Sequence, residues 1–382
     1  MHILLTGARA PACLEWARAF RAAGWEVSVG DSLSWPLTRA SNAVDHFLRL
    51  PEARHHPQAW GRALEQAVHR MGIDLILPTC EEAFYLSHIA GQLSCQVLVS
   101  DFSLLHRLHH KAHFAWLTQG WPAAAPPTSL LSSRVELDDF IRQHATAGKK
   151  LPWVFKPAYS RFAKRTQICP TERQLENLQP SPTEPWVAQR YIAGREHCSY
   201  SLFSAGRLTA HACYHPRHRV GSGSGIWFEP SDPPAIRSFV EAFGQATNFH
   251  GQVAFDFIED SNGQCHVLEC NPRATSGVHL FDDQPQALVQ ALLGEGPPLL
   301  PTGKPRMVGL AMLLFGAPRK ALTQGFWQDY QIAHDVIGRP GDTGPLWAQL
   351  PGLLEICARA LRRRCGLLAA ATTDIEWDGQ PL

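Results

Sequence analysis

Two acidic residues, Asp256 and Glu269, have the spacing to face each other across a hairpin. The apolar runs 252–258 and 265–269 predict its strands, and Asn262-Gly263 between them is the strongest short signal for a two-residue turn. Counting outward from that turn pairs Asp256 with Glu269, and directly opposed residues point to the same face of a sheet. Two carboxylates placed side by side repel each other unless a cation lies between them or one holds a proton.

Asn271 and Arg273 extend the same site. Asn271 lies two residues beyond Glu269, so its side chain stays on that face if the strand continues. Two carboxylates and an amide oxygen suit a hard divalent ion such as Mg²⁺, which completes its shell with substrate phosphates and water. Arg273 adds a planar cation suited to a carboxylate or a phosphate. The alternative interpretation is an ordinary surface hairpin with solvated acids.

These residues resemble a known signature. Asp256, followed by Glu269-Cys270-Asn271-Pro272-Arg273, is similar to the metal-binding motif of the ATP-grasp superfamily. In that family an acid on one strand precedes Glu-x-Asn-Pro-Arg after the next strand. The resemblance covers roughly residues 111–273 and leaves out about the last hundred. It implies an α/β fold: a Rossmann-like N-terminal domain, a two-lobed ATP-grasp domain and a small C-terminal extension.

Two lysines match further parts of the family pattern. Lys111 opens an apolar helix that is followed by a glycine and a proline-containing segment, and the family's equivalent lysine reaches ATP phosphate. The alternative for Lys111 is a solvated helix lysine. Lys156 ends the strand predicted over 152–157, where a buried amine needs an anion. The resemblance places Lys156 on the α- and β-phosphates, and implies that both lysines and Arg273 stabilise the transferring phosphoryl group.

The loop 158–166 stands where the family usually has a glycine-rich flap, but it contains no glycine. Its polar residues Ser160, Arg161, Lys164 and Arg165 could clamp phosphate through their side chains. The departure leaves open whether backbone amides grip the γ-phosphate.

The segment 186–196 resembles the strand that joins the two lobes of the family. By that pattern the Arg190 carbonyl and the Ile192 amide contact adenine, and Glu196 holds the ribose hydroxyls. Gln189 stands where the family often has an acid. Its amide can still accept a hydrogen bond from the adenine amine, so ATP is still expected. The alternative is a plain edge strand followed by a turn.

The N-terminal part alternates strands and helices, which predicts a parallel sheet. The expected strands are 2–5, 25–29, 74–77 and 96–99, and the expected helices are 11–23, 59–71 and 82–93. The sequence Thr6-Gly7-Ala8-Arg9 lacks the glycine pattern that lets a backbone approach pyrophosphate, so a dinucleotide site here is a weak hypothesis. Glu81 and Glu82 lie at the edge where such sheets bind ligands, or serve as helix N-terminal acids.

Other patterns are less specific. Four histidines at 106, 109, 110 and 113 have the spacing of one helix face, either a metal site or a solvated surface. A hairpin turn is expected at Ala205-Gly206. The Gly/Ser run 221–225, which follows several basic residues, predicts a mobile loop over the acceptor site or an exposed linker. Beyond it we expect helices at 285–293 and 350–368 and strands at 307–314 and 372–377.

Composition sets the broad class. The chain has 382 residues and is 45% hydrophobic and 18% charged, which is typical of a globular protein of two or three domains. A net charge of +1 gives no footprint for nucleic acid or a membrane surface. No signal peptide or membrane span is predicted, and ten cysteines without a Cys-x-x-Cys pair indicate reduced thiols in a cytoplasm. The expected domains are 1–105, 106–300 (lobes 106–185 and 186–300) and 301–382.

Together these features predict an ATP-grasp carboxylate–amine ligase. The resemblance implies ATP with Mg²⁺ or Mn²⁺, small-molecule carboxylate and amine substrates, an acyl phosphate intermediate, and ADP and phosphate as products. No nucleic-acid or membrane partner is expected, and a homodimer is compatible with the pattern. Two alternatives stay open. One is an ATP-binding regulatory module, suggested by the missing flap glycines, and the other is a nicotinamide-dependent oxidoreductase on the N-terminal sheet.

Overall fold

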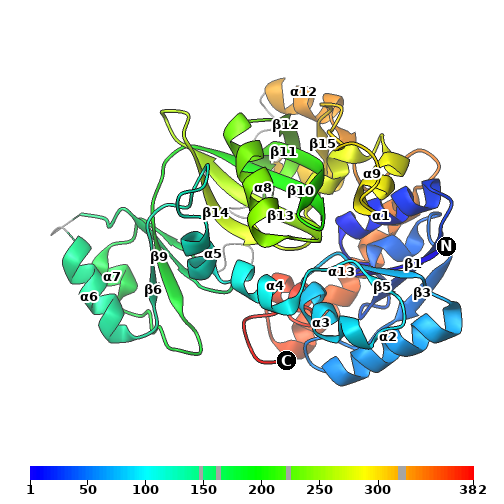
Figure 1. Ribbon diagram of the computed structural model, residues 1–382, viewed down its shortest axis with the longest axis horizontal. Coiled ribbons are helices and arrows are strands. Elements are labelled where there is room, and N and C mark those ends of the chain that lie inside the picture. The colour runs from blue at the N-terminus through cyan, green and yellow to red at the C-terminus, as the bar shows by residue number, and fades with distance from the viewer. Residues whose placement is uncertain (146–148, 161–164, 221–224, 317–323) are drawn as a thin grey trace.

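Three sheets organise the part of the chain that the structure describes (Figure 1). The computed structural model describes residues 1–145, 149–160, 165–220, 225–316 and 324–382. A lobe built on a four-stranded sheet projects to the left in Figure 1, a seven-stranded sheet lies at the centre, and a five-stranded parallel sheet lies at the right. The predicted α/β class, with a parallel N-terminal sheet, is confirmed. Among the described residues no helix is long and apolar enough to span a lipid bilayer.

The N-terminal domain has the strand order β3-β2-β1-β4-β5, with all neighbours parallel. Its strands are β1 (His2–Thr6), β2 (Glu26–Asp31), β3 (His46–Arg49), β4 (Leu75–Pro78) and β5 (Gln96–Val97). Its helices are α1 (Pro11–Ala22), α2 (Pro57–Met71) and α3 (Glu82–Ile89), with 3-10 turns at Leu37–Ala40 and Ala90–Gln92. Strands β1 and β4 are wholly buried, so they read as continuous apolar runs. Strand β3 was not predicted, because its four residues are exposed or half-buried and do not form a long apolar run.

The small lobe has its own core. Its strand order is β6-β9-β7-β8, formed by β6 (Thr128–Leu131), β7 (Trp153–Pro157), β8 (Gln167–Ile168) and β9 (Trp186–Arg190). Helices α6 (Arg134–His144) and α7 (Glu172–Leu175) complete it. Trp153, Phe155 and Trp186 fill this core together with Leu137 from α6. The predicted strands around Lys156 and Gln189 are therefore neighbours in one sheet.

The large lobe carries the predicted hairpin. Its strand order is β14-β13-β10-β11-β12-β15-β16. The strands are β10 (Arg195–Ser204), β11 (Arg207–Arg219), β12 (Gly225–Ser231), β13 (Gly251–Glu259), β14 (Cys265–Asn271), β15 (Arg306–Met307) and β16 (His334–Asp335). Helices α8 (Pro234–Thr247) and α9 (Pro285–Leu292) and a 3-10 segment at Ser276–Phe281 pack against this sheet. Ala205 and Gly206 form the predicted turn, with positive φ at both residues.

The four-histidine prediction is wrong in its geometry. Helix α4 (Phe102–His109) ends before α5 (Lys111–Leu117) begins, and His110 between them has extended backbone. His110 caps α5, because its Nδ1 accepts a hydrogen bond of 3.3 Å from the backbone of His113. His106 and His109 therefore lie in α4, His113 lies in α5 and His110 lies between the helices, so the four do not form one helix face. No group of three or more His, Cys, Asp or Glu side chains that could hold a metal occurs in the described part of the chain.

The C-terminal segment differs most from expectation. The strand predicted over 307–314 is wrong, because only Arg306–Met307 pairs before the chain turns into α10 (Gly309–Ala311) and a π-helical turn at Met312–Gly316. Helix α12 (Gln324–Ile332) follows, then α13 (Gly344–Arg363) and α14 (Leu367–Thr372). The strand predicted over 372–377 is also wrong, since α14 ends there and a tail without regular structure follows.

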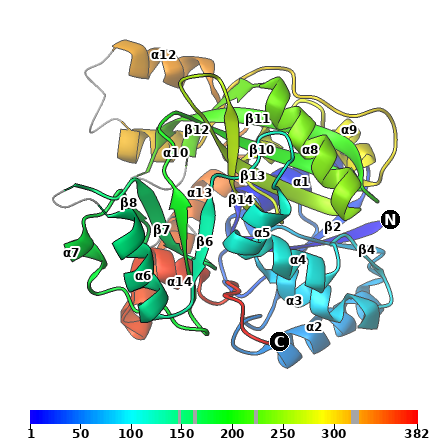
Figure 2. The ribbon, with the colours of Figure 1, turned by 60° about the vertical axis from the view of Figure 1, so that its left-hand side comes forward.

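Helices α13 and α14 are fastened to the N-terminal domain by buried charges. Arg9 pairs with Asp31 at 2.6 Å and with Asp374 at 2.7 Å, and Arg359 pairs with Asp374 at 3.1 Å. Ser32 also hydrogen-bonds Asp374. This network lies where strands β1 and β2 end, so the C-terminal segment covers that edge of the parallel sheet. Figure 2 shows the tail continuing from there between the small lobe and helices α3 and α4.

Candidate active site

Asp256 and Glu269 face each other in the β13–β14 ladder, as predicted, and Asn271 follows opposite Ala254. The turn itself is longer than predicted. Glu259, not Asp260, pairs with Cys265. The Asp260 backbone N–H donates to the Gln264 carbonyl at 2.9 Å, which leaves three residues in the loop. A three-residue loop that ends in a glycine of positive φ is a common hairpin connection, and Gly263 has φ 77°.

A bulge restores the expected pairing. Phe257 pairs with Val267 while Asp256 pairs with Glu269, so Leu268 is an extra residue in β14. A bulge of this kind shifts the register by one. The longer turn and the bulge therefore cancel, and simple counting reached the right carboxylate pair from a wrong turn. The carbonyl of the extra residue, Leu268, accepts a hydrogen bond of 3.4 Å from Lys156 Nζ.

The electrostatics of the pair fit a cation. Burial and the charge of Glu269 raise the pKa of Asp256 to about 6. Burial also raises the pKa of Glu269, but the charges of Lys111 and Lys156 outweigh it and bring that pKa to about 2. Asn271 Nδ2 donates to Asp256 Oδ2 at 3.2 Å, which holds the amide on the same face. Two carboxylates and an amide oxygen form a hard donor set that suits Mg²⁺ with phosphate and water completing its shell.

Both predicted lysines reach this pair. Lys111 is only 4% exposed, and its Nζ lies 3.6 Å from Glu269 Oε2 and donates to the Ser160 carbonyl at 3.1 Å. It is therefore not a solvated helix lysine. Lys156 is also buried, and burial together with the charge of Lys111 lowers its pKa to about 8, against the opposing effect of Glu269. Two buried amines beside the carboxylates form a site suited to a polyanion.

The hinge residues lie where the chain passes from one sheet to the other. Gln189 is buried, and its Oε1 accepts a hydrogen bond of 3.1 Å from Lys156 while its Nε2 donates to Thr128 Oγ1. Arg190 is the last residue of β9, and its N–H donates to the Pro127 carbonyl at 2.8 Å. Ile192 is half-buried in the connection to β10. Glu196 lies on the other side of this connection, is exposed, and forms an ion pair with Arg219.

Arg273 connects the hairpin to the N-terminal domain. Its Nη2 donates to Asn271 Oδ1 at 3.0 Å, and its Nε lies 3.6 Å from Glu81 Oε1. Glu81 is 1% exposed. Glu82 has a different role, because its carboxylate accepts from the Thr6 hydroxyl at 2.8 Å and from backbone N–H groups of the turn before α3. Of the two acids noted in the sequence, Glu81 is the one beside the site.

The flap is only partly described. Arg161 and Lys164 lie outside the described residues, as does most of the Gly/Ser run that begins at 221. The Ser160 carbonyl binds Lys111, and its hydroxyl donates to the Pro157 carbonyl at 3.4 Å. Arg165 pairs with Glu184 and lies over the ring of Trp186.

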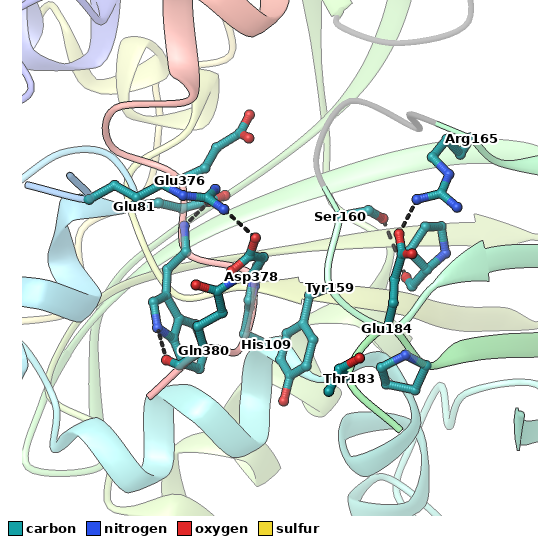
Figure 3. A pocket seen from close by; sticks show the side chains of 14 residues that line it. Glu81, His109, Tyr159, Ser160, Arg165, Thr183, Glu184, Glu376, Asp378 and Gln380 are labelled. Carbon is teal, nitrogen blue, oxygen red and sulfur yellow. Dashed lines mark hydrogen bonds and ion pairs between the residues drawn. The ribbon is translucent and has the colours of Figure 1, made fainter. Parts of the chain in front are cut away.

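A cavity of about 330 Å³ adjoins these residues. It is lined by Arg54, Glu81, His109, Pro157, Tyr159, Ser160, Arg165, Thr183, Glu184, Pro185, Glu376, Trp377, Asp378 and Gln380. In Figure 3 the side chains of Ser160, Thr183 and Glu184 stand on one side, those of Glu376, Asp378 and Gln380 on the other, and Tyr159 between. Sequence analysis missed the tail 376–380. The available signal was a Trp-Asp-Gly triplet in a polar tail, but nothing local connects it to residues near 81 or 159.

No protein-family model matches the chain, and no curated protein matches its sequence. Among solved structures, N5-carboxyaminoimidazole synthetase from Staphylococcus aureus with ADP superposes with a TM-score of 0.64 at 17% identity, covering 84% of this chain and 86% of that chain. L-amino acid ligase from Bacillus licheniformis gives 0.59 at 15% identity, covering 78% and 76%.

The third comparison is the biotin carboxylase domain dimer of the Hydrogenobacter thermophilus 2-oxoglutarate carboxylase, with MgADP, ADP and bicarbonate. It gives a TM-score of 0.59 at 15% identity, covering 77% of this chain and 70% of that chain. All three are ATP-grasp enzymes. At these identities the likeness concerns the fold, and this chain has the ATP-grasp fold.

Proposed function

We propose that this protein is an ATP-dependent ligase that joins a carboxylate to an amine and releases ADP and phosphate. One observation carries the proposal. Lys111 of α5 and Lys156 of β7 lie beside the Asp256–Glu269 pair of the large lobe, with the Lys111–Glu269 contact at 3.6 Å. Two buried lysines beside two half-buried carboxylates at a hinge suit a nucleotide triphosphate with its metal.

The proposed site has metal-binding and phosphate-binding residues. Asp256, Glu269 and Asn271 supply oxygen ligands for Mg²⁺ or Mn²⁺. The ion would supply positive charge that neutralises the negative charge developing on the phosphate during transfer. Lys111 and Lys156 bind phosphate oxygens, and Ser160 borders them through the carbonyl that holds Lys111.

The adenine base and the ribose of the nucleotide bind at the hinge residues. The Arg190 carbonyl and the Ile192 amide contact adenine, and Gln189 can accept from its amine with the second lone pair of Oε1. Glu196 binds the ribose hydroxyls in exchange for its ion pair with Arg219. These assignments follow the family pattern, and they are supported by the position of the four residues at the end of β9, in the connection and at the start of β10.

The reaction has two steps. An oxygen of the carboxylate attacks the γ-phosphorus, the bond between that phosphorus and the β–γ bridging oxygen breaks, and ADP leaves. The amine nitrogen then attacks the acyl carbon, and the carbon–oxygen bond to phosphate breaks. The departing phosphate takes up the proton that the nitrogen loses. Arg273 stabilises the oxygen-rich transition state of the first step with its planar guanidinium.

Both alternatives are less well supported. A nicotinamide cofactor would need the edge of the parallel sheet where β1 and β2 end, and Arg9, Asp31 and Asp374 fill that edge with ion pairs. A regulatory module without turnover was suggested by the glycine-free flap. The lysines and carboxylates proposed to bind phosphate and metal nevertheless lie beside a cavity of about 330 Å³ that could hold a substrate, which supports an enzyme.

The test is acyl phosphate trapping. The protein is incubated with ATP, Mg²⁺, hydroxylamine and pools of carboxylic acids, and ADP, phosphate and hydroxamate are measured. We expect one pool to give a hydroxamate with equal amounts of ADP and phosphate. Glu269→Gln is the matched inactive control. Release of AMP and pyrophosphate would contradict transfer from the γ-position, and ATP binding without hydroxamate from any pool would favour the regulatory module.

A further inference from the structure

Helix α13 turns polar residues toward the protein and leucines toward solvent. Its Glu355 accepts hydrogen bonds of 2.8 and 3.0 Å from backbone N–H groups of the loop after β2, and its Arg359 pairs with Asp374 at 3.1 Å. These two residues are four positions apart, so they share one side of the helix, and that side lies against the N-terminal domain. A helix at the surface of a globular protein normally has the opposite arrangement.

The other side of α13 is exposed and apolar. We call it the apolar face of α13, and its residues are Leu346 (38% exposed), Trp347 (76%), Leu350 (65%), Leu353 (51%), Leu354 (61%) and Leu361 (81%). Trp347, Leu350 and Leu354 follow one another at intervals of three and four residues, which places them in one stripe along the helix. Cys357 and Leu361 continue the stripe at the same two intervals.

No charge interrupts the apolar face. Between Leu346 and Leu361 the helix has only two charged residues, Glu355 and Arg359, and both belong to the opposite side. Charged residues are depleted at the centre of protein–protein interfaces, and tryptophan is enriched there. The composition of the face is therefore that of an interface centre.

The area of the face is large for a surface that stays in contact with water. At roughly 250 Å² for a tryptophan and roughly 180 Å² for a leucine, the exposed fractions amount to about 700 Å² of accessible surface. The largest apolar patch of a typical monomer covers about 300–600 Å². Each partner in a stable protein–protein interface buries about 800 Å², so the face with a narrow rim reaches that size.

The spacing of the face fits a second copy of the same helix. Apolar residues at alternating intervals of three and four form the seam between two helices, because each side chain enters a gap between side chains of the facing helix. A two-fold axis brings one patch against the same patch of another chain. A stripe that is apolar along its whole length is complementary to its own copy in that arrangement.

The end of α13 decides between the two possible orientations. Arg362, Arg363 and Arg364 follow Leu361 directly. Parallel helices would bring the two arginine runs together, and like charges repel. Antiparallel helices of 20 residues keep the two runs about 30 Å apart.

We propose that the protein forms a two-fold homodimer through the apolar face of α13. The two helices are antiparallel, Leu354 lies at the two-fold axis, and Trp347 contacts Leu361 of the second copy. The proposal does not depend on the ligase function, because none of these residues is assigned to a substrate, a metal or a nucleotide.

Sedimentation equilibrium of the full-length protein tests the association. We expect the wild type to be dimeric at about 10 μM and the double variant Leu350→Glu, Leu354→Glu to have a Kd at least about a hundredfold higher, since four carboxylates would meet near the axis. Val135→Glu replaces an exposed apolar residue of α6 and is the matched control, which should stay dimeric. A wild type that is monomeric at about 100 μM, or a double variant that still dimerises, would overturn the proposal.

Cross-linking tests the surface without a disruptive substitution. Leu354→Cys and Leu361→Cys are each made in a Cys357→Ser, Cys365→Ser background and treated with a short bismaleimide reagent. We expect a covalent dimer from Leu354→Cys, which meets its own copy at the axis. Leu361→Cys should give none, because seven residues of helix place it about 10 Å from the axis on either side.

The background protein without an added cysteine is the control for both. A dimer that cross-links at neither position would use another surface, and a dimer that cross-links equally at both would have parallel helices. Either result would overturn the proposed arrangement.

Other occupants of the face give different results. A lipid surface would leave the wild type monomeric in sedimentation and bound to vesicles of phosphatidylcholine and phosphatidylserine in a flotation assay. A different protein partner would leave it monomeric and unbound to those vesicles. Both outcomes would overturn the second copy as the occupant.

Discussion

Lys156 of β7 donates a hydrogen bond of 3.1 Å to Gln189 of β9, its diagonal neighbour across the strand pair in the small lobe. An amide oxygen carries no net charge, so this partner compensates the ammonium only partly. Burial and the nearby Lys111 therefore lower the pKa of Lys156 to about 8. The strength of phosphate binding at this lysine should consequently depend on pH within an accessible range.

We expect ATP affinity to fall as pH rises through about 8, because the amine of Lys156 is cationic below its pKa and neutral above it. Gln189→Glu should move the fall to higher pH, since a carboxylate stabilises the ammonium form. Calorimetric titration of MgATP over a pH series measures both midpoints. Lys156→Met is the control and should bind weakly at every pH; the same midpoint in wild type and Gln189→Glu would contradict the assignment.

The facing carboxylates should couple ATP to metal. We expect ATP to bind the wild type much more tightly with Mg²⁺ than without it, and Glu269→Gln to lose most of that difference. The reason is that Asp256 and Glu269 repel each other until a cation or a proton lies between them. Titrations with Mg²⁺ and with chelator test the coupling, and Glu241→Gln on the exposed side of α8 is the control. ATP binding of equal strength with and without Mg²⁺ would contradict the proposed metal site.

Glu196 should affect the nucleotide and not the fold. Its ion pair with Arg219 is solvent-exposed, so Glu196→Ala should change the free energy of unfolding by less than about 1 kcal/mol. The same variant should weaken ATP binding several-fold if Glu196 holds the ribose, and it should leave the preference among acceptor amines unchanged. An altered amine preference with normal ATP affinity would show that Glu196 lines another pocket and does not hold the ribose.

Arg273 should act on turnover more than on nucleotide affinity. Arg273→Lys keeps the charge but loses the planar fork that binds two oxygens at once. We expect MgATP affinity within a few-fold of wild type and a loss of most of the rate of hydroxamate formation. A comparison of kcat with the Kd for MgATP separates the two effects. A variant with wild-type kcat would show that Arg273 only connects the hairpin to Glu81.

The buried ion pairs of Asp374 with Arg9 and Arg359 predict that the free energy of unfolding falls in acid. Burial opposes ionisation of Asp374, but Arg9 outweighs it, with Ser32 and Arg359 contributing, and its pKa lies well below the usual 3.8. Its contribution is therefore fully present above about pH 5 and is lost as pH falls below the unfolded-state value near 3.8. Asp374→Asn should lower the free energy of unfolding by about 3–5 kcal/mol at neutral pH, because it removes a negative charge that pairs with two buried guanidinium groups.

Denaturant unfolding of wild type and Asp374→Asn at several pH values measures this difference. The gap between the two proteins should shrink as pH falls toward 3. Asp378→Asn, in the half-buried tail, is the comparison and should show a small gap. A gap that stays constant with pH would mean that Asp374 contributes through packing and not through its charge.

Local patterns were enough to locate much of the site. Counting outward from the Asn262-Gly263 turn reached the Asp256–Glu269 pair, because the longer turn and the bulge at Leu268 offset each other. Lys156 was recognisable because a lysine within an apolar strand needs a partner. The parallel N-terminal sheet followed from the alternation of strands and helices along the chain.

Contacts between distant segments were not predictable. Glu81 and Trp377 are neighbours in space, but no local period or turn signal relates them. The break at His110 was missed because the spacing of the histidines fits one continuous helix, and only the backbone of His110 separates α4 from α5. The bulge at Leu268 leaves no sequence mark, since leucine is ordinary in a strand.

That bulge has a consequence for how the hairpin tolerates changes in chain length. Leu268 opposes no residue of its own in the ladder, and pairing is regular on both sides of it. Deleting Leu268 would leave Val267 opposite Phe257 and Glu269 opposite Asp256, and would remove only the carbonyl that Lys156 uses. The gene can therefore lose or regain one codon beside the two carboxylates without moving either of them to the opposite face of the sheet.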